Sequence, residues 1–412
     1  MLTFDYKCPS PSAIPPRSVN HFLRRFLSTS RKRPSAHPNR CPTQKHRKRK
    51  MGSAQNQVQP CHEEEDPCLK ALLYSSYHVF PVILHAAVEL DLFGIIARAG
   101  PGAYVSPAEV VAHLPTQTLE SPEIIDRVLR CLASHSLLTY KSETFDEGRT
   151  VERRYAISPV GKYYVKDEDG GSIGSLSLFA FHRATIDVWL QVKEAMVGGG
   201  NLFQKVHGKT IFQYMKEDST LNMYFNNAMA DLSATQTKKI LEVYHGFDGI
   251  STLVDVGGGK GATLNMIVSK YPSIKGINFD LPQVIEHAPP YPGVQHVGGD
   301  MFASVPEGDA IMIKGTCHNW SDESCIKFLK NCYKALPANG KVIVMDFIMP
   351  DEPEETMASK YVSMLDNAML IQPGGKERTE KQFEYLCKEA GFTGFKVAAR
   401  AVSALGVIEF TK

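Results

Sequence analysis

The second half of the chain alternates two hydrophobic patterns. Short apolar runs rich in Val and Ile are typical of buried strands, and apolar residues recur at the helical period between most of them. This alternation predicts a doubly wound, mostly parallel sheet. The expected strands are 252–256, 275–279, 294–297, 308–313, 341–346, 394–398 and 405–410.

The last two of these strands are joined by only a short link. A parallel pair needs a long crossover connection, so one of the two is expected to run antiparallel. The predicted fold class is therefore α/β, with a Rossmann-like, seven-stranded, mostly parallel sheet. A seventh, reversed strand differs from the six-strand, all-parallel plan of nicotinamide dehydrogenases and favours a methyltransferase.

The region before the sheet predicts several helices followed by a two-stranded hairpin. Apolar residues at a helical period begin at Leu69, and Pro81 starts a second helix because proline is tolerated in a first turn. Residues 106–109, Ser-Pro-Ala-Glu, form a capping box at a third helix. Short strands near 137–140 and 155–158 complete the order of a winged-helix module.

A winged-helix shape raises the question of DNA binding. The candidate recognition helix, 122–134, carries two arginines but also Glu123 and Asp126, so it lacks the basic face that phosphate contacts require. We therefore expect a surface for self-association and no nucleic-acid binding. The next stretch, 171–247, is predicted to be helical, and its aromatic side chains suit either ordinary core or a cleft for a flat substrate.

The candidate ligand site begins at residues 253–261, LVDVGGGKG. An apolar run enters a turn that contains Gly257, Gly258, Gly259 and Gly261, and a helical pattern follows. Glycines let a ligand approach the backbone closely, and such a turn at the carboxyl end of a strand is where open α/β sheets bind nucleotides. Tight packing also selects glycines there, so the turn by itself leaves both interpretations open.

Two acids follow this turn at the ends of later strands. Asp280 lies 23 positions after Gly257, close to the spacing at which a carboxylate meets both hydroxyls of a ribose. Asp300 and Met301 follow the next strand and suit an adenine, one by hydrogen bonding and the other by stacking. Solvated loop acids are the ordinary alternative, but three matched strand ends favour a nucleotide-like ligand.

A candidate base follows the strand 308–313. His318 lies in the loop at its carboxyl end, on the expected cofactor side. Asp346 ends another strand and Glu377 follows the sharp turn 372–376, so both acids are expected at the same edge. Acids that flank a histidine fix its tautomer and orientation, although a lone histidine is more often structural.

Composition narrows the class of protein. Hydrophobic content of 43% and charged content of 22% are typical of a soluble globular protein, and no apolar run approaches the length that spans a bilayer. The nine cysteines are odd in number and contain no CxxC pair, so we expect reduced thiols rather than a disulfide or zinc framework. No His and Asp cluster has metal-ligand spacing, and no metal is expected.

Charge is divided unevenly along the chain. Residues 1–50 carry 13 Lys and Arg against one acid, a net charge of +12, and the remainder carries −10. The basic segment is expected to be disordered. It is either an organelle transit peptide, a nucleic-acid or nuclear-import segment at 45–50, or an extension ahead of a true start at Met51. We favour the last and expect a cytoplasmic protein, with organelle import if the extension is real.

Five motifs together carry a resemblance: LVDVGGGKG, NFDLP, VGGDMF, H-x-W-x-D-E and PGGKERT. From about Leu69 to Lys412 the chain resembles the plant caffeate-type O-methyltransferases, which use S-adenosylmethionine and need no metal. The resemblance implies a homodimer whose N-terminal module helps to close the substrate pocket of the partner. The expected plan is a basic extension at 1–60, a winged-helix-like dimerisation domain at 61–165, and a methyltransferase domain with substrate-pocket helices at 166–412.

The resemblance also implies roles for single residues. His318 matches the general base, and Asp346 and Glu377 match the acids that flank it. The matching cofactor contacts are Ser233, Gly257, Asp280, Leu281, Asp300, Met301 and Lys314. The implied substrate pocket is lined by Phe179, Ala180, Met229, Leu232, Trp320 and Met369.

Elementary chemistry independently supports a histidine base. A phenol has a pKa near 10, so only about one molecule in a thousand is ionised at neutral pH. A neutral imidazole near its own pKa of about 6.5 takes the proton as the oxygen attacks the methyl group. The sulfonium already activates that methyl group, and the remaining task is in-line positioning.

The chain departs from the caffeate pattern around the acceptor and not around the cofactor. Asp346 stands where the lignin-pathway enzymes usually have Glu, and Gly315 and Thr316 replace a bulky Trp-Ile pair. We therefore expect methylation of a phenolic hydroxyl on a phenylpropanoid, caffeate-like or flavonoid acceptor, with its identity open. The other replacements are Leu232 for a histidine, Ala180 for an asparagine and Asn319 for an aspartate.

Two other functions stay open. An N-methyltransferase acting on an aromatic amine would need less from His318, because a neutral amine is already nucleophilic. A catalytically silent or nucleic-acid-binding protein would be expected to lose His318 or Glu377, and both are present. The expected partners are a small phenolic substrate and a second copy of the chain, with no nucleic acid and no membrane.

Overall fold

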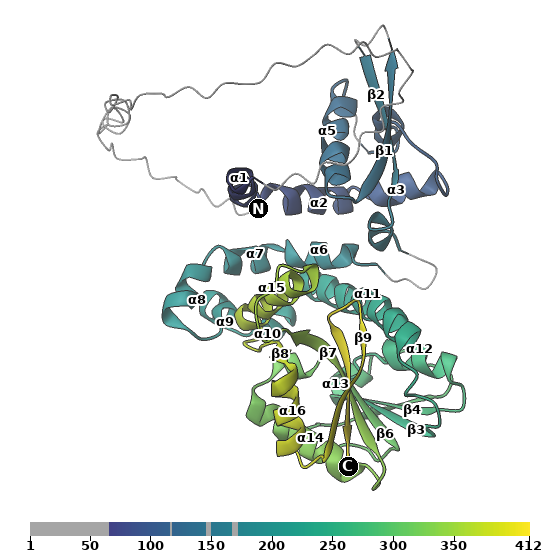
Figure 1. Ribbon diagram of the computed structural model, residues 1–412, viewed down its shortest axis with the longest axis vertical. Helices are drawn as coiled ribbons and strands as arrows, with labels where there is room; N and C mark the ends of the chain where they lie inside the picture. Colours follow the sequence, from purple (N-terminus) through teal and green to yellow (C-terminus); the bar gives the residue numbers. More distant parts are fainter. Residues whose placement is uncertain (1–65, 116–117, 146–149, 167–171) are drawn as a thin grey trace, which may run out of the picture. The chain divides into compact units, whose positions relative to one another are not determined.

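A computed structural model describes residues 66–115, 118–145, 150–166 and 172–412 of the chain. These residues belong to one compact unit, Glu65–Lys412, and helices of its C-terminal part flank the main sheet (Figure 1). The predicted basic extension lies outside the described residues. The predicted domain boundaries, including the one at 165, stay predictions.

The main sheet contains eight strands within the described residues. They are β3 (Thr252–Val256), β4 (Lys275–Asp280), β5 (Val294–Gly298), β6 (Ala310–Lys314), β7 (Lys341–Met349), β8 (Arg378–Thr379), β9 (Gly394–Ala401) and β10 (Leu405–Thr411). Seven follow the order β5-β4-β3-β6-β7-β10-β9, and β8 pairs with β7. β10 runs antiparallel to both of its neighbours, β7 and β9, and the other pairs of the sheet are parallel. All seven predicted strands are therefore confirmed, the last is the reversed one, and β8 is an addition.

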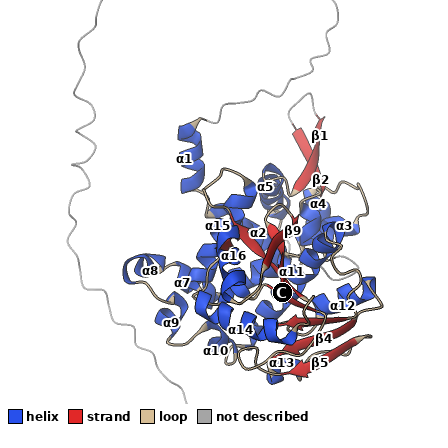
Figure 2. Cartoon of the chain, turned by 60° about the horizontal axis from the view of Figure 1, so that its bottom comes forward, coloured by secondary structure: helices blue, strands red, loops and turns tan. Residues whose placement is uncertain are grey.

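Helices cover both faces of the sheet because side chains alternate along each strand. On one face Val254 and Val256 pack with α14 and α16, and on the other Leu253 packs with α11, α12 and α15. Figure 2 shows helices on both sides of the red strands. The helices of this region are α11 (Ser219–Val243), α12 (Ala262–Lys270), α13 (Pro282–Ile285), α14 (Asp322–Ala335), α15 (Met357–Ile371) and α16 (Glu380–Glu389).

Five short α-helices occupy much of residues 174–215, directly before α11, within the stretch 171–247 that is predicted to be helical. Phe203 is fully buried and Phe179 nearly so, and both belong to a core cluster that also includes Ile371 of α15. Several of the aromatic side chains noted in the sequence are thus ordinary core. The helices are α6 (Gly174–Ala180), α7 (Arg183–Trp189), α8 (Val192–Gly198), α9 (Leu202–His207) and α10 (Ile211–Met215).

The N-terminal part folds as helices followed by a hairpin. The capping box forms, because the N–H of Glu109 donates to Ser106 Oγ and the N–H of Ser106 donates to the Glu109 carboxylate. The winged-helix assignment stays a prediction. The elements are α1 (Pro67–Ser75), α2 (Val79–Glu89), α3 (Leu92–Arg98), α4 (Pro107–Val111), α5 (Ser121–Ser134), β1 (Leu138–Phe145) and β2 (Thr150–Ile157).

Two expectations from composition, one about membrane-spanning segments and one about cysteines, can be compared with the described residues. No single helix among the described residues is long and apolar enough to cross a membrane, although α1 and α2, bent by 50°, satisfy length and composition as a pair. Six cysteines are described and all are free thiols. Four of them are buried, whereas Cys68 is exposed and Cys131 is half-buried.

Candidate active site

The turn after β3 requires glycine for two different reasons. Gly257, Gly259 and Gly261 have φ angles of 74°, 58° and 85°, a region that residues with a Cβ rarely adopt. Gly258 lies instead against two polar side chains of β3 and β4, and a Cβ there would overlap them. The backbone of the turn is thereby left open to a ligand.

The acids predicted at strand ends lie beside this turn. Asp280 accepts a hydrogen bond from the backbone N–H of Gly259 at 2.8 Å and another from Leu281 at 2.7 Å. Each carboxylate oxygen can accept a second hydrogen bond, so Asp280 keeps capacity for the hydroxyls of a ribose. Asp300 follows the neighbouring strand β5 and accepts from the N–H of Phe302 at 2.9 Å. These parallel strands end at one edge, where open α/β sheets bind ligands.

Lys314 ends β6 at the same edge. Its Nζ donates to Ser233 Oγ at 3.1 Å, which joins two predicted cofactor contacts that are 81 positions apart. Burial lowers the pKa of Lys314 to about 8, against the opposing charges of Asp255 and Asp346. Asp255 is 1% exposed, and burial raises its pKa to about 7 although the charge of Lys314 opposes this. The edge therefore contains a buried lysine with a lowered pKa and a buried acid with a raised pKa.

His318 lies one loop beyond Lys314, in the short 3-10 helix Cys317–Asn319. Its Nδ1 is 2.8 Å from Oε1 of Glu377, whose side chain is fully buried. With Glu377 ionised, Nδ1 carries the hydrogen and Nε2 is the basic nitrogen. Burial lowers the pKa of His318, but the Glu377 hydrogen bond and the charge of Asp346 outweigh it and leave that pKa raised.

Asp346 acts on His318 through charge and not through a direct hydrogen bond. It belongs to β7, is 2% exposed, and neither carboxylate oxygen has a hydrogen-bond partner among the described residues. Burial raises the pKa of Asp346 to about 6, opposed by the charge of His318. Asp is one methylene shorter than the Glu of the caffeate pattern, and Asp346 makes no direct hydrogen bond to His318.

The residues predicted to line a substrate pocket come from several elements. Phe179 of α6 and Met229 of α11 pack in one cluster. Trp320 is 38% exposed and packs edge-on against Phe302, with ring centroids 4.9 Å apart. Gly315 has a φ of 58°, and a Cβ built on it meets no atom within 4 Å, so space is open where the caffeate pattern has a bulky residue. The remaining residues are Ala180 on α6, Leu232 on α11 and Met369 on α15, and their shared role as a pocket stays a prediction.

Sequence reasoning missed two buried charged residues at this edge. Asp255 lies under the glycine turn, and Arg378 is fully buried directly after Glu377. The signal was present, since both residues stand inside the quoted motifs LVDVGGGKG and PGGKERT. What the motifs do not reveal is which groups each side chain contacts.

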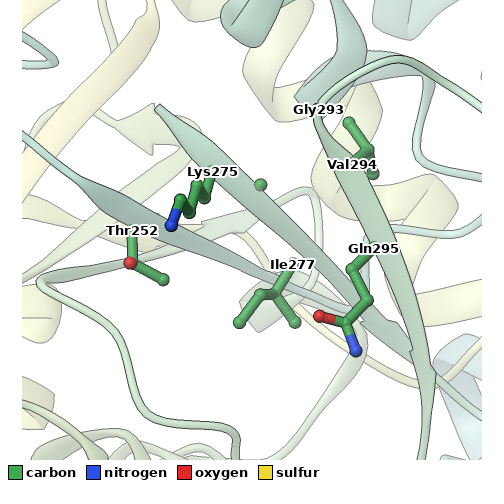
Figure 3. A pocket seen from close by; sticks show the side chains of 7 residues that line it. Thr252, Lys275, Ile277, Gly293, Val294 and Gln295 are labelled. Carbon is green, nitrogen blue, oxygen red and sulfur yellow. The ribbon is translucent and has the colours of Figure 1, made fainter. Parts of the chain in front are cut away.

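A hollow lies at the amino ends of the strands, opposite the carboxyl ends that form the candidate site (Figure 3). It is lined by the first residues of three strands, Thr252, Lys275 and Val294, with their neighbours. The carboxyl ends that hold His318 and Lys314 are at the other end of the strands, so this hollow is separate from the candidate site. Within the described parts of the chain no three His, Cys, Asp or Glu side chains gather to hold a metal ion. A metal-free reaction stays a prediction.

Comparison with known proteins agrees with this geometry. Residues 189–393 match the family model of the O-methyltransferase domain, and residues 72–167 match the O-methyltransferase dimerisation domain. The caffeic acid 3-O-methyltransferase of Rosa chinensis is 53% identical over 365 residues, which cover 88% of this chain and 100% of that protein. The caffeic acid 3-O-methyltransferase of Medicago sativa is 51% identical with the same coverage.

Solved structures show the same fold at lower identity. The crystal structure of human N-acetylserotonin methyltransferase in complex with SAM has a TM-score of 0.70 and 21% identity, over 85% of this chain and 99% of that one. The plant relatives share about half of their residues with this chain over their whole length. The chain therefore belongs to the caffeate-type family of plant S-adenosylmethionine-dependent O-methyltransferases.

Proposed function

We propose that this protein transfers a methyl group from S-adenosylmethionine to a phenolic hydroxyl of a phenylpropanoid-type small molecule, with His318 as the general base. The observation that carries the proposal is the His318–Glu377 pair, one loop beyond Lys314 at the edge that also holds the glycine turn. The names of the plant relatives support a phenolic acceptor.

The residues at this edge fit S-adenosylmethionine. The cofactor combines a ribose diol, an adenine and charged amino-acid groups around its sulfonium. The turn at Gly257–Gly261 leaves the backbone open, Asp280 keeps acceptor capacity for the diol, and Asp300 stands at the next strand end. Lys314 provides a cation for the carboxylate of the amino-acid part. The ribose, the adenine and that carboxylate thus each have a matching group.

The proposed mechanism assigns one proton transfer to the protein. Bound S-adenosylmethionine supplies an electrophilic methyl group. Nε2 of His318 accepts the phenolic proton as the oxygen attacks, and Glu377 holds Nδ1–H and stabilises the imidazolium that forms. Asp346 adds a second negative charge that favours the imidazolium. A positioned general base contributes about 10²- to 10⁴-fold to a rate, which is what His318 has to supply.

Self-association is proposed through the first two helices. Large apolar side chains of α1 are exposed, with Leu69 at 65% and Leu72 at 61%, and Val82 of α2 is 52% exposed. Helix α2 lies within the part of the chain that matches the dimerisation domain, and that part begins at residue 72, inside α1. A patch of this kind marks an interaction site, and a second copy of the chain is the proposed occupant. Light scattering of the purified protein is expected to give the mass of a dimer.

The proposed methyl transfer and the identity of its acceptor are tested with labelled S-adenosylmethionine and a panel of phenols. Caffeate is the first phenol to be tried. Caffeate with both ring hydroxyls already methylated is the matched control and should accept nothing. Product structures separate O- from N-methylation when aromatic amines are included in the panel. Transfer to at least one phenol is expected, and absence of transfer to all phenols by a protein that binds the cofactor would overturn the proposal.

A further inference from the structure

A buried arginine binds the loop that carries His318. Arg378 is fully buried, and its Nη1 donates to the carbonyl oxygen of Cys317 at 2.6 Å. Its Nη2 donates to the carbonyl oxygen of Trp320 at 2.7 Å. These two carbonyl groups lie on either side of His318 along the chain, so one guanidinium spans the turn that presents the imidazole.

Residues next to Arg378 hold the same loop. The backbone N–H of Lys376 donates to the carbonyl oxygen of His318 at 2.9 Å. Gly375 packs so closely that a Cβ on it would overlap this oxygen. Glu377 lies between them and binds the imidazole itself. The segment 375–378 therefore fixes both the backbone and the ring of His318.

A carboxylate on α14 completes the arrangement. Nε of Arg378 donates to Oδ1 of Asp322 at 2.9 Å, and Nζ of Lys376 donates to Oδ2 at 2.8 Å. These two hydrogen bonds hold the pKa of Asp322 below its ordinary value, although burial opposes them. Asp322 also begins α14, where a helix favours negative charge.

A buried guanidinium is costly unless its hydrogen bonds are made, and here all three nitrogens of Arg378 have partners. The planar fork of arginine matches two carbonyl groups and a carboxylate at once, whereas a lysine would provide a single point charge. The ion pair with Asp322 alone would leave the carbonyl groups of Cys317 and Trp320 without this donor. The two bonds to the carbonyl groups beside His318 point to a more specific role.

We propose that Arg378 is a positioning residue for the methyl transfer: it sets the loop Cys317–Trp320 so that Nδ1 of His318 meets Glu377 and Nε2 faces the acceptor. This rests on the proposed role of His318 as the base. Arg378 touches neither substrate nor cofactor in this account and acts through the loop.

The test compares Arg378→Lys, Arg378→Met and Gly375→Ala with the wild-type dimer, using caffeate or the acceptor identified by the panel. Displacement of a catalytic group by about 1 Å costs roughly 10²-fold, so kcat of Arg378→Met is expected to fall about that much. The kcat of Arg378→Lys is expected to lie between that of the wild type and that of Arg378→Met. The Kd for S-adenosylmethionine, measured by calorimetry, is expected to change less than about twofold in each.

Gly375→Ala is a second variant of the same loop, so the proposal can still be tested if Arg378→Met folds poorly. Gly375 is not among the glycines with positive φ, so its own backbone conformation suits alanine, and the new methyl group must displace the backbone of His318 and Asn319, which it would otherwise overlap. The variant changes no charge, and its pH profile therefore reports geometry alone. Gly198→Ala is the matched control, since a Cβ there meets only the flexible end of Lys205.

The pH profile separates positioning from general support of the fold. The charged groups that face His318 are Glu377, Asp346 and Lys314. A loosened pair with Glu377 lets the pKa of His318 fall, so the acid limb of kcat for Gly375→Ala is expected to move to lower pH. Loss of active protein alone would scale the whole profile down in parallel with bound cofactor.

Three outcomes are distinguishable. Reduced kcat with a displaced acid limb and normal cofactor affinity supports the proposal. Wild-type kcat in Gly375→Ala and Arg378→Met, or reduced kcat with an unmoved limb, overturns it while leaving the base role of His318 intact. Full activity in His318→Gln, measured alongside, removes the base role itself and with it the reason for positioning.

Discussion

Replacing Glu377 by glutamine tests the pair that the mechanism depends on. The change removes one negative charge and keeps the size of the side chain, so packing in this fully buried position is preserved. We expect kcat to fall while the affinity for S-adenosylmethionine stays the same. The reason is that Glu377 contacts the imidazole and none of the predicted cofactor residues.

The magnitude follows from the contact itself. The hydrogen bond between His318 Nδ1 and Glu377 Oε1 is 2.8 Å long and involves a buried charge. Hydrogen bonds to charged groups contribute about 1.5 to 3 kcal/mol. With about 1.36 kcal/mol for each factor of ten in rate, a loss of roughly 10- to 160-fold in kcat is expected.

The acid limb of the pH profile gives a second readout. The Glu377 hydrogen bond raises the pKa of His318, and a base must be unprotonated to act. Without the carboxylate that pKa falls, so Glu377→Gln should remain active to lower pH than the wild type. Glu380→Gln is the matched control, because Glu380 pairs with Arg400 at the surface. An unchanged kcat or an unmoved limb in Glu377→Gln would refute the reasoning.

Three further changes test other parts of the account. Gly258→Ala should abolish measurable cofactor binding by calorimetry, because its Cβ would overlap polar side chains beneath the turn; normal affinity would argue against the turn as the cofactor site. Lys314→Met should weaken cofactor binding by at least about tenfold, since a charge-assisted contact of about 1.5 kcal/mol is lost; an equal Kd would remove Lys314 from that role. Ser106→Ala should lower the free energy of unfolding by about 1 kcal/mol through loss of the N-cap, seen as a lower Tm with unchanged kcat; an unchanged Tm would contradict this.

The strands and the ligand edge could be predicted because their signals are local. Apolar runs mark β3 to β7, and the carboxyl ends of parallel strands must meet at one edge once the sheet forms. Helix α3 was not predicted, because its apolar residues continue the pattern of α2. The break is made by Asp91, whose left-handed φ of 51° separates the two helices.

The contacts by which Arg378 holds the His318 loop could not be predicted, because they join residues that are far apart in the sequence. Arg378 and Asp322 are 56 positions apart, and their contact exists only because β8 lies beside β7 and α14 follows the His318 loop. A local pattern shows that an arginine follows Glu377 but not that its guanidinium is buried. The unpartnered oxygens of Asp346 are likewise a property of packing, since only burial by surrounding elements removes them from water.

The rate of His318→Gln as a function of pH tests the central claim most directly. With caffeate and saturating S-adenosylmethionine, kcat at neutral pH is expected to fall about 10²- to 10⁴-fold, with cofactor affinity unchanged. Without the base only ionised phenol reacts, so the residual rate should rise about tenfold per pH unit toward the phenol pKa near 10. A variant that keeps the wild-type rate at neutral pH would contradict the assignment of His318 as the base.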